Sequence, residues 1–337
     1  MKRKWTAMLS ALGMAALIFD SKTALLGAEA GIEVCMKTVV PSLFPFFVLS
    51  ILLGGALAGQ RMRLLSPLAR LLKVPENAVS LIVVGLLGGY PVGAQVVAGA
   101  YEDGRLAKKD AQRMLAFCSN AGPAFLFGMG ARLFDELWIC FLVWFIHIVS
   151  SWCVALLTPC SSARNAGYTT NGGVTLTQAL KKAVAVLATV CGWVVLFRVL
   201  IAFADRWVLW AVTPEVRAVI IGFSELANGC CELQKIGCVG LRISLFAVLL
   251  SFGGLCVMMQ TASVCEGLRI GLYLPGKICQ GAISLLLSIP VQLLLPRQER
   301  WVCGAALIVL CCTVCVVYRF FAVKKQKSSS IRAAAVV

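Results

Sequence analysis

Long apolar segments alternate with short polar breaks along almost the whole chain. The runs at 137–157, 278–295 and 302–323 each have about the 20 residues that a helix needs to cross the hydrocarbon core of a bilayer. Shorter or interrupted apolar stretches cover 5–19, 46–58, 81–87, 180–204, 216–223 and 241–260. All of them are continuous rather than alternating, which favours helices over the strands of a membrane barrel. We therefore expect an all-α, polytopic membrane protein.

Composition and charge place this protein in the bilayer. The chain is 60% hydrophobic and only 14% charged, with a mean hydropathy of +0.90. A soluble domain has about 45–50% apolar and about 25% charged residues, so lipid must cover the excess apolar surface. The formal net charge is +16, and Lys and Arg gather at 2–4, 61–73 and 324–332. This pattern is typical of cytoplasmic loops, and it predicts that both termini are cytoplasmic, with an even number of crossings.

Three further features exclude other classes. The 16 cysteines lie mostly in apolar runs, where a thiol packs as a small hydrophobe, so we expect neither a disulfide framework nor a metal site. Basic and aromatic residues are not interleaved, so nucleic acid is not an expected partner. The basic start and the apolar run at 5–19 resemble a signal peptide, with Ala28–Ala30 as a cleavage site. Further apolar segments follow directly, which favours an uncleaved first helix.

The central stretch at 81–127 contains two polar breaks. Its first apolar run enters Gly88–Gly93, and Cys118–Pro123 forms the second break. Pro91 removes a backbone donor and clashes with the preceding helical turn. Lipid cannot satisfy the freed backbone groups, so they must face protein or a hydrated cavity, as in transporters that bind substrate at broken helices. The alternative is close helix packing through the Gly-x-x-x-Gly spacing of Gly89 and Gly93.

The second half of the chain repeats this order of features. Ser224–Gly229 follows an apolar run, and Ser251–Gly254 lies 251 minus 119, or 132, residues after Ser119. We predict two inverted repeats, each with a re-entrant or broken hairpin and an odd number of crossings, in keeping with two cytoplasmic termini. The expected units are a first repeat at 1–157 with its hairpin at about 78–123, a linker at 158–174, a second repeat at 175–323 with its hairpin at about 216–254, and a basic tail at 324–337.

The candidate substrate-binding residues lie in or near these breaks. They are Gly89, Tyr90, Pro91, Gln95, Ser119, Asn120, Gly122, Asn228, Ser251 and Gln260. Ser119 and Asn120 precede a helix start, where free N–H groups attract anions, although they could equally serve as caps without a ligand. Tyr90 and Gln95 would orient the substrate.

Two ionisable side chains are candidates for coupling. Glu225 stands between apolar runs, and an intramembrane carboxylate could bind Na⁺, carry H⁺ or gate the site, whereas in a surface loop it would do none of these. His147, the single histidine, lies in the middle of a predicted span, where it could relay protons or merely bond a neighbouring carbonyl. The sequence contains none of the metalloprotease, serine-hydrolase or phosphate-loop motifs, so we do not expect an enzyme, and no cofactor beyond a coupling ion is predicted.

Four motifs together resemble the YlbJ-type sporulation integral membrane proteins, within the wider nucleoside-recognition or Gate domain group. They are Pro41–Phe47, Gly88–Ala94, Leu115–Ala124 and Leu250–Gly254. The resemblance covers about 24–323 and implies a fold similar to concentrative nucleoside transporters. It also implies a bacterial cytoplasmic or forespore membrane location and a role in moving dipicolinic acid across a forespore membrane during sporulation. The chain departs from the family pattern at Leu255–Met259, which is more apolar than expected.

The sequence thus predicts membrane transport of a small organic anion, with dipicolinic acid as the leading substrate. A nucleoside permease and a metal-ion permease are the alternatives within transport. The alternative of another class is a non-transporting membrane scaffold that recruits sporulation proteins. Partners beyond the anion and the bilayer would be sporulation proteins or further copies of the chain.

Overall fold

The structure is a computed structural model that describes residues 2–57, 60, 62–159, 173–265 and 267–294. Over these residues it contains helices, turns and loops and no strand, which confirms the all-α class. Six of the described helical segments are long and apolar enough to cross a membrane, which confirms the polytopic class. The predicted span at 302–323, the basic tail and most of the linker at 158–174 lie outside the described residues.

The first half contains the described helices α1 to α9. Their bounds are α1 Lys2–Phe19, α2 Ser21–Val34, α3 Val40–Ala56, α4 Ser66–Leu72, α5 Val79–Gly88, α6 Val92–Glu102, α7 Lys108–Cys118, α8 Pro123–Leu133 and α9 Leu137–Leu157. The second half contains α10 Leu176–Trp207, α11 Pro214–Ser224, α12 Leu226–Glu232, α13 Val239–Phe252, α14 Gly254–Val264 and α15 Tyr273–Leu294. Short 3₁₀ turns lie at Arg63–Leu65, Glu76–Ala78, Leu209–Ala211 and Leu233–Lys235.

Proline favours a helix break, but Pro41 and Pro45 do not interrupt the first long helical segment, Ser21–Ala56. α2 runs into α3 through a π-helical turn at Cys35–Val39, in which the Val40 N–H donates to the Cys35 carbonyl. Pro41 is the second residue of α3, two positions after this turn. The Ser42 hydroxyl donates to the Thr38 carbonyl at 2.6 Å, and the helix continues through Pro41 to Ala56.

The same order of elements occurs in both halves. In each half a pair of short helices forms a hairpin, a helix interrupted by a few residues follows, and an unbroken helix comes last. These elements are α5–α6, α7–α8 and α9 in the first half, and α11–α12, α13–α14 and α15 in the second. A single long helical segment precedes each set: α2–α3 in the first half and α10 in the second.

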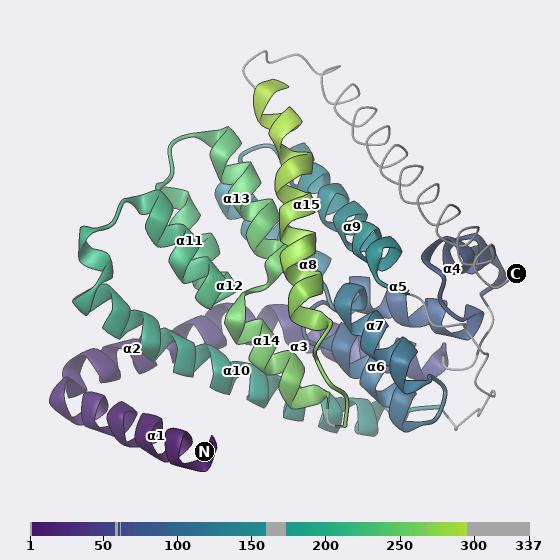
Figure 1. Ribbon diagram of the computed structural model, residues 1–337, viewed down its shortest axis with the longest axis horizontal. Helices are drawn as coiled ribbons and strands as arrows, with labels where there is room; N and C mark the ends of the chain where they lie inside the picture. Colours follow the sequence, from purple (N-terminus) through teal and green to yellow (C-terminus); the bar gives the residue numbers. More distant parts are fainter. Residues whose placement is uncertain (1, 58–59, 61, 160–172, 266, 295–337) are drawn as a thin grey trace, which may run out of the picture.

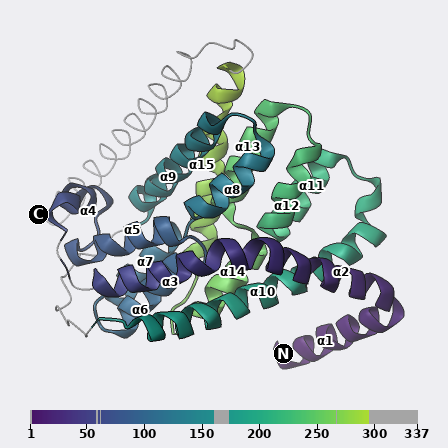
Figure 2. The same ribbon diagram turned by 180° about the vertical axis from the view of Figure 1, so that it is seen from behind.

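The long segments lie together along one side of the molecule. α2, α3 and α10 run beside one another in both views, while α9, α13 and α15 form a group next to them (Figure 1, Figure 2). Two glycines allow the close approach of α2 to α10, because a Cβ at Gly27 would lie 2.9 Å from Ala202 Cβ and one at Gly31 would lie 2.9 Å from Val195 Cα. Glycines four residues apart are typical of tightly packed membrane helices.

Candidate functional site

The tip of the first hairpin lies against the break between α7 and α8. Gly89 has a φ of +76°, and a Cβ on it would lie only 2.7 Å from the backbone N of Gly122. Only glycine adopts this backbone conformation and tolerates this approach without strain. The Gly-x-x-x-Gly pair does not lie on one helix, because α5 ends at Gly88 and α6 begins at Val92.

Tyr90, at the same tip, reaches the second half of the chain. Its hydroxyl donates to the Leu250 carbonyl at 3.2 Å, near the end of α13. Its ring lies against Gly253, where a Cβ would approach the Tyr90 ring carbon to 3.1 Å. The first hairpin therefore contacts the α13–α14 break as well as the α7–α8 break.

The tip of the second hairpin lies against the other side of the α13–α14 break. A Cβ on Gly254 would lie 3.1 Å from the Gly222 carbonyl oxygen and 3.4 Å from the Leu226 N. Gly253 and Gly254 both have a φ of +84°, a conformation that favours glycine. The four helix breaks thus form one continuous set of contacts, in which the Gly253–Gly254 segment lies between the two hairpin tips.

A buried polar face of α15 borders these breaks. Its side chains at 277, 280, 284 and 288 share one helix face, and each is at most 1% exposed: Lys277, Gln280, Ser284 and Ser288. Large apolar side chains on other faces of the same helix are exposed: Ile278, Leu285, Leu286 and Ile289. α15 is therefore polar toward the protein and apolar toward its surroundings, as expected where lipid covers the outer face.

Lys277 is the centre of this polar face. Its ammonium donates to the Ser119 carbonyl, to Asn120 Oδ1 at 3.3 Å and to Gln280 Oε1 at 2.8 Å. The rings of Tyr90 and Tyr273 lie with their centroids 5.1 and 5.7 Å from Nζ, within cation–π range. We call this set of five partners the lysine cradle.

The hydrogen bonds fix the orientation of both amides in the lysine cradle. Asn120 Nδ2 donates to the Phe117 carbonyl at 2.7 Å, and Gln280 Nε2 donates to Asn120 Oδ1 at 3.0 Å and to the His147 carbonyl at 3.3 Å. Turning either amide around would place oxygen against oxygen. All three atoms that contact Lys277 Nζ are therefore acceptors, and three acceptors require the three N–H groups of an ammonium.

His147 connects the two broken helices. The Ala121 N–H donates to its Nε2 at 3.1 Å, so Nδ1 carries the ring proton and donates to Ser251 Oγ at 3.0 Å. The Ser251 hydroxyl donates to Ser284 Oγ at 2.6 Å, and the Ser284 hydroxyl donates to Ser150 Oγ at 2.9 Å. Both ring nitrogens are used within the protein, and whether this chain of groups relays protons stays a prediction.

Glu225 lies at the start of α12 and is 3% exposed, so it does not stand in an exposed surface loop. Its carboxylate accepts from the Ala227 N–H at 3.0 Å, from the Asn228 N–H at 2.7 Å and from Asn228 Nδ2 at 2.6 Å. A carboxylate that accepts from the first free amides is an N-cap. Asn228 therefore donates both its backbone N–H and its side-chain amide to Glu225, and both residues lie at the second hairpin tip.

The structure brings six of the predicted binding residues together. Gly89, Tyr90, Ser119, Asn120, Gly122 and Ser251 belong to the converging breaks and their hydrogen bonds. Pro91 directly follows them as the residue before α6. Gln260 donates to Cys256 Sγ at 3.3 Å within α14, and Gln95 Oε1 on α6 is buried without a hydrogen-bond partner among the described residues.

Sequence reasoning missed Lys277, Gln280 and Ser284. The apolar run that predicts this span begins at Ile278, one residue after the lysine. The sequence does contain a signal for these residues: polar side chains at intervals of three and four form one polar stripe on an otherwise apolar helix. No group of three or more His, Cys, Asp or Glu side chains within the described residues could hold a metal ion.

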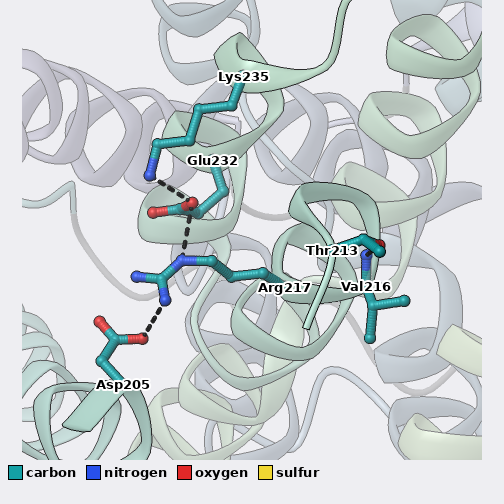
Figure 3. A network of polar contacts seen from close by, with 6 residues as sticks. All are labelled: Asp205, Thr213, Val216, Arg217, Glu232 and Lys235. Atoms are coloured by element: carbon teal, nitrogen blue, oxygen red, sulfur yellow. Dashed lines mark hydrogen bonds and ion pairs between the residues drawn. The ribbon is translucent and has the colours of Figure 1, made fainter. Parts of the chain in front are cut away.

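A second polar network ties the second hairpin to α10 (Figure 3). Arg217 on α11 pairs with Asp205 of α10 at 2.9 Å and with Glu232 of α12 at 3.0 Å, and Lys235 pairs with Glu232 at 2.8 Å. Burial tends to raise the pKa of Glu232, but the hydrogen bond from Lys235 and the charge of Arg217 outweigh it and lower the pKa below its usual value. The network fixes one side of the hairpin without touching its tip.

A known protein is similar to part of the chain. The chain is 30% identical over 103 residues to the sporulation integral membrane protein YlbJ of Bacillus subtilis, a match that covers 30% of this chain and 25% of YlbJ. The chain thus spans about a quarter of the length of the curated relative that it matches. No family model matches the chain. No solved structure is significantly similar to it. The chain is an integral membrane protein that resembles a YlbJ-type sporulation protein over the matched part, as its motifs predicted.

Proposed function

We propose that the protein transports a small organic anion across a membrane, with dipicolinic acid as the leading substrate. The observation that carries this proposal is the Lys277 ammonium, which is 1% exposed and held by neutral oxygens. None of the ion pairs between described residues includes Lys277. A buried charge without a counter-ion is strongly unfavourable, and an anionic substrate would be that counter-ion.

The order of elements supports transport. Two sets of a hairpin, a broken helix and an unbroken helix are the parts of an inverted-repeat transporter, in which one set moves against the other around a fixed site. In this proposal the halves are inverted repeats similar to concentrative nucleoside transporters. The two hairpins would open in turn, and Glu225, which caps the second hairpin next to Gly254, would act as the gate.

The chemistry of the lysine cradle suits a flat aromatic dicarboxylate. One carboxylate would replace neutral oxygens beside Lys277, with Ser119 and Asn120 as further partners. The rings of Tyr90 and Tyr273 offer faces and edges for stacking with the pyridine ring of dipicolinate. Gln95, with an unpartnered buried amide oxygen, would turn toward the second carboxyl group when that group is protonated or hydrated.

Uptake of radiolabelled dipicolinate into proteoliposomes tests the proposal. Wild-type protein should raise uptake above that of empty vesicles. Asn120→Ala should reduce uptake at least tenfold, because it removes a donor–acceptor pair from the lysine cradle. Thr189→Ala is the matched control, since the Thr189 hydroxyl is exposed and bonds only the Ala185 carbonyl of its own helix. Equal uptake by empty vesicles would contradict the proposal.

A thermal-shift screen separates the alternatives. Dipicolinate, uridine and divalent cations would each be added to purified protein, and a ligand at 100 times its dissociation constant should stabilise the fold by about 2.7 kcal/mol. Stabilisation by uridine alone or by a cation alone would favour the alternative permeases. The scaffold alternative predicts stabilisation by none of them.

A further inference from the structure

We infer that Lys277 is also the proton carrier of this transporter, so that one proton crosses the membrane with each anion. The inference rests on the proposed function and assigns its coupling. It places the coupling proton on a side chain that sequence reasoning did not single out, rather than on Glu225. The Glu225 carboxylate already accepts three hydrogen bonds at the start of α12, which is the role of a structural cap.

The hydrogen-bond geometry describes a protonated side chain. The three oxygens around Nζ can only accept, so each needs one N–H group. A neutral amine has two N–H groups and a lone pair, and it would have to give up one of the three contacts. Of the three contacts, the one with the Ser119 carbonyl lies nearest to a hairpin that would move in transport, because Ser119 is in the α7–α8 break against the first hairpin. The protonation state of Lys277 would therefore change the contacts of a helix break.

The groups around Lys277 leave its charge uncompensated. The titratable groups that face it or lie closest on each packed element are Tyr90 of the first hairpin, Cys118 of α7, His147 of α9, and Tyr273 and Cys279 of α15. None of these is an acid that is charged at neutral pH in its ordinary state. His147 is neutral, because one ring nitrogen accepts while the other donates. Arg113 of α7 adds positive charge and bonds the carbonyls of Leu72, Lys73 and Ala155.

Anion binding and proton binding are consequently linked. A bound carboxylate favours the ammonium more strongly than the neutral oxygens of the lysine cradle do, and by reciprocity the ammonium favours the carboxylate. On the loading side the Lys277 amine takes a proton from a hydronium ion and leaves water. On the release side one N–H bond breaks, the proton passes to water, and the anion leaves a neutral amine behind. Each cycle thus moves one anion and one proton and restores Lys277.

Proton uptake on binding tests the inference in wild-type protein. Full-length protein in weakly buffered detergent would be mixed with dipicolinate at several values between pH 7 and 9, with a pH-indicator dye present. We expect uptake of up to one proton per bound dipicolinate at some pH in this range. Binding without proton uptake at any pH would overturn the inference and leave anion transport standing. An absence of dipicolinate binding would overturn both.

Transport by variants tests the assignment to Lys277. In proteoliposomes with the membrane potential clamped at zero, an acid exterior should drive about tenfold accumulation per pH unit if one proton accompanies each anion. Lys277→Arg stays charged at all pH values, so it should lose this accumulation while still exchanging labelled for unlabelled dipicolinate. Lys277→Gln should lose proton uptake on binding. Lys182→Arg, on an exposed site of α10, is the control and should accumulate as the wild type does.

The assignment to Lys277 would be overturned if either variant still took up a proton on binding dipicolinate. It would also be overturned if either variant still accumulated dipicolinate tenfold per pH unit. A shared melting temperature of wild type and variants, measured without ligand, would show that the variants fold. Wild-type vesicles that neither exchange nor accumulate dipicolinate would instead overturn the proposed function.

Discussion

The side chain of Lys277 donates a hydrogen bond to the backbone carbonyl of Ser119 across 158 residues of sequence. The bond joins the unbroken helix α15 of the second half to the α7–α8 break of the first. It is buried at both ends, because Lys277 is 1% exposed and Ser119 is 0% exposed. A helix break has free backbone groups that must be satisfied inside the protein, and here a charged side chain from the other half does so.

Gln280→Glu should give the Lys277 ammonium an internal counter-ion. The new carboxylate would stand where Gln280 Oε1 now accepts at 2.8 Å. We expect dipicolinate uptake to fall at least tenfold and the thermal shift that dipicolinate causes to shrink, because the internal anion competes with the substrate. In the ligand-free protein the loss of the two bonds donated by Gln280 Nε2 opposes the gain from the new ion pair. Gln178→Glu on the exposed start of α10 is the control. Undiminished dipicolinate binding in Gln280→Glu would contradict a role of Lys277 in pairing with the anion.

Gly89→Ala should destabilise the first hairpin tip. The positive φ and the 2.7 Å approach of a Cβ to the Gly122 N both oppose a side chain, and strain of this kind costs about 1–3 kcal/mol. Gly99→Ala in α6 of the same hairpin is the matched control, because nothing lies within 4 Å of its Cβ position and helical alanine is favoured over glycine by about 1 kcal/mol. Thermal melts of both variants should therefore shift in opposite directions.

The breaks could be predicted from sequence because their cause is local. Glycine and proline restrict the backbone wherever they lie, so Gly88–Gly93 and Ser251–Gly254 are visible without knowledge of the fold. The same rule fails at Pro41, because a π-helical turn ends two residues earlier and the helix continues through the proline. That turn lies against α10, where Cys35 Sγ donates to the Cys191 carbonyl at 3.7 Å, and no local pattern reports this contact.

The lysine cradle could not be predicted in the same way. Its members come from the first hairpin tip, the α7–α8 break and α15, and one of its hydrogen bonds joins Gln280 to Asn120 across 160 residues. The polar stripe from Lys277 to Ser288 can be recognised in the sequence. Its role in the site cannot, because that depends on which face of α15 is turned away from lipid. Asn120 and Tyr90 were found because they lie in breaks, whereas Lys277 lies in the first turns of a regular helix.

Acid should weaken the attachment of the second hairpin to α10. The pKa of Glu232 is lower in the folded protein than its ordinary value of 4.5. Its stabilising contribution is therefore fully present above about pH 4.5 and is lost as the pH falls through the lowered folded value. Melting temperatures measured from pH 7 downward should fall less steeply in Glu232→Gln than in wild type. Glu215→Gln, also on this hairpin, should follow the wild-type curve, and equal slopes for wild type and Glu232→Gln would contradict the role of the network.

Two serines on the same buried face of α15 should differ in their effect on stability. Ser284 bonds Ser251 at 2.6 Å and Ser150 at 2.9 Å, so it joins the two broken-helix regions through α15. Ser284→Ala leaves two buried hydroxyls each short of a partner, which should cost about 1–3 kcal/mol. Ser288 is equally buried but donates to the Leu285 carbonyl of its own helix at 2.8 Å, so Ser288→Ala should change stability by less than about 0.5 kcal/mol. Thermal or denaturant unfolding of the two variants measures the difference, and equal losses would show that burial, not the bridge between the halves, sets the contribution of Ser284.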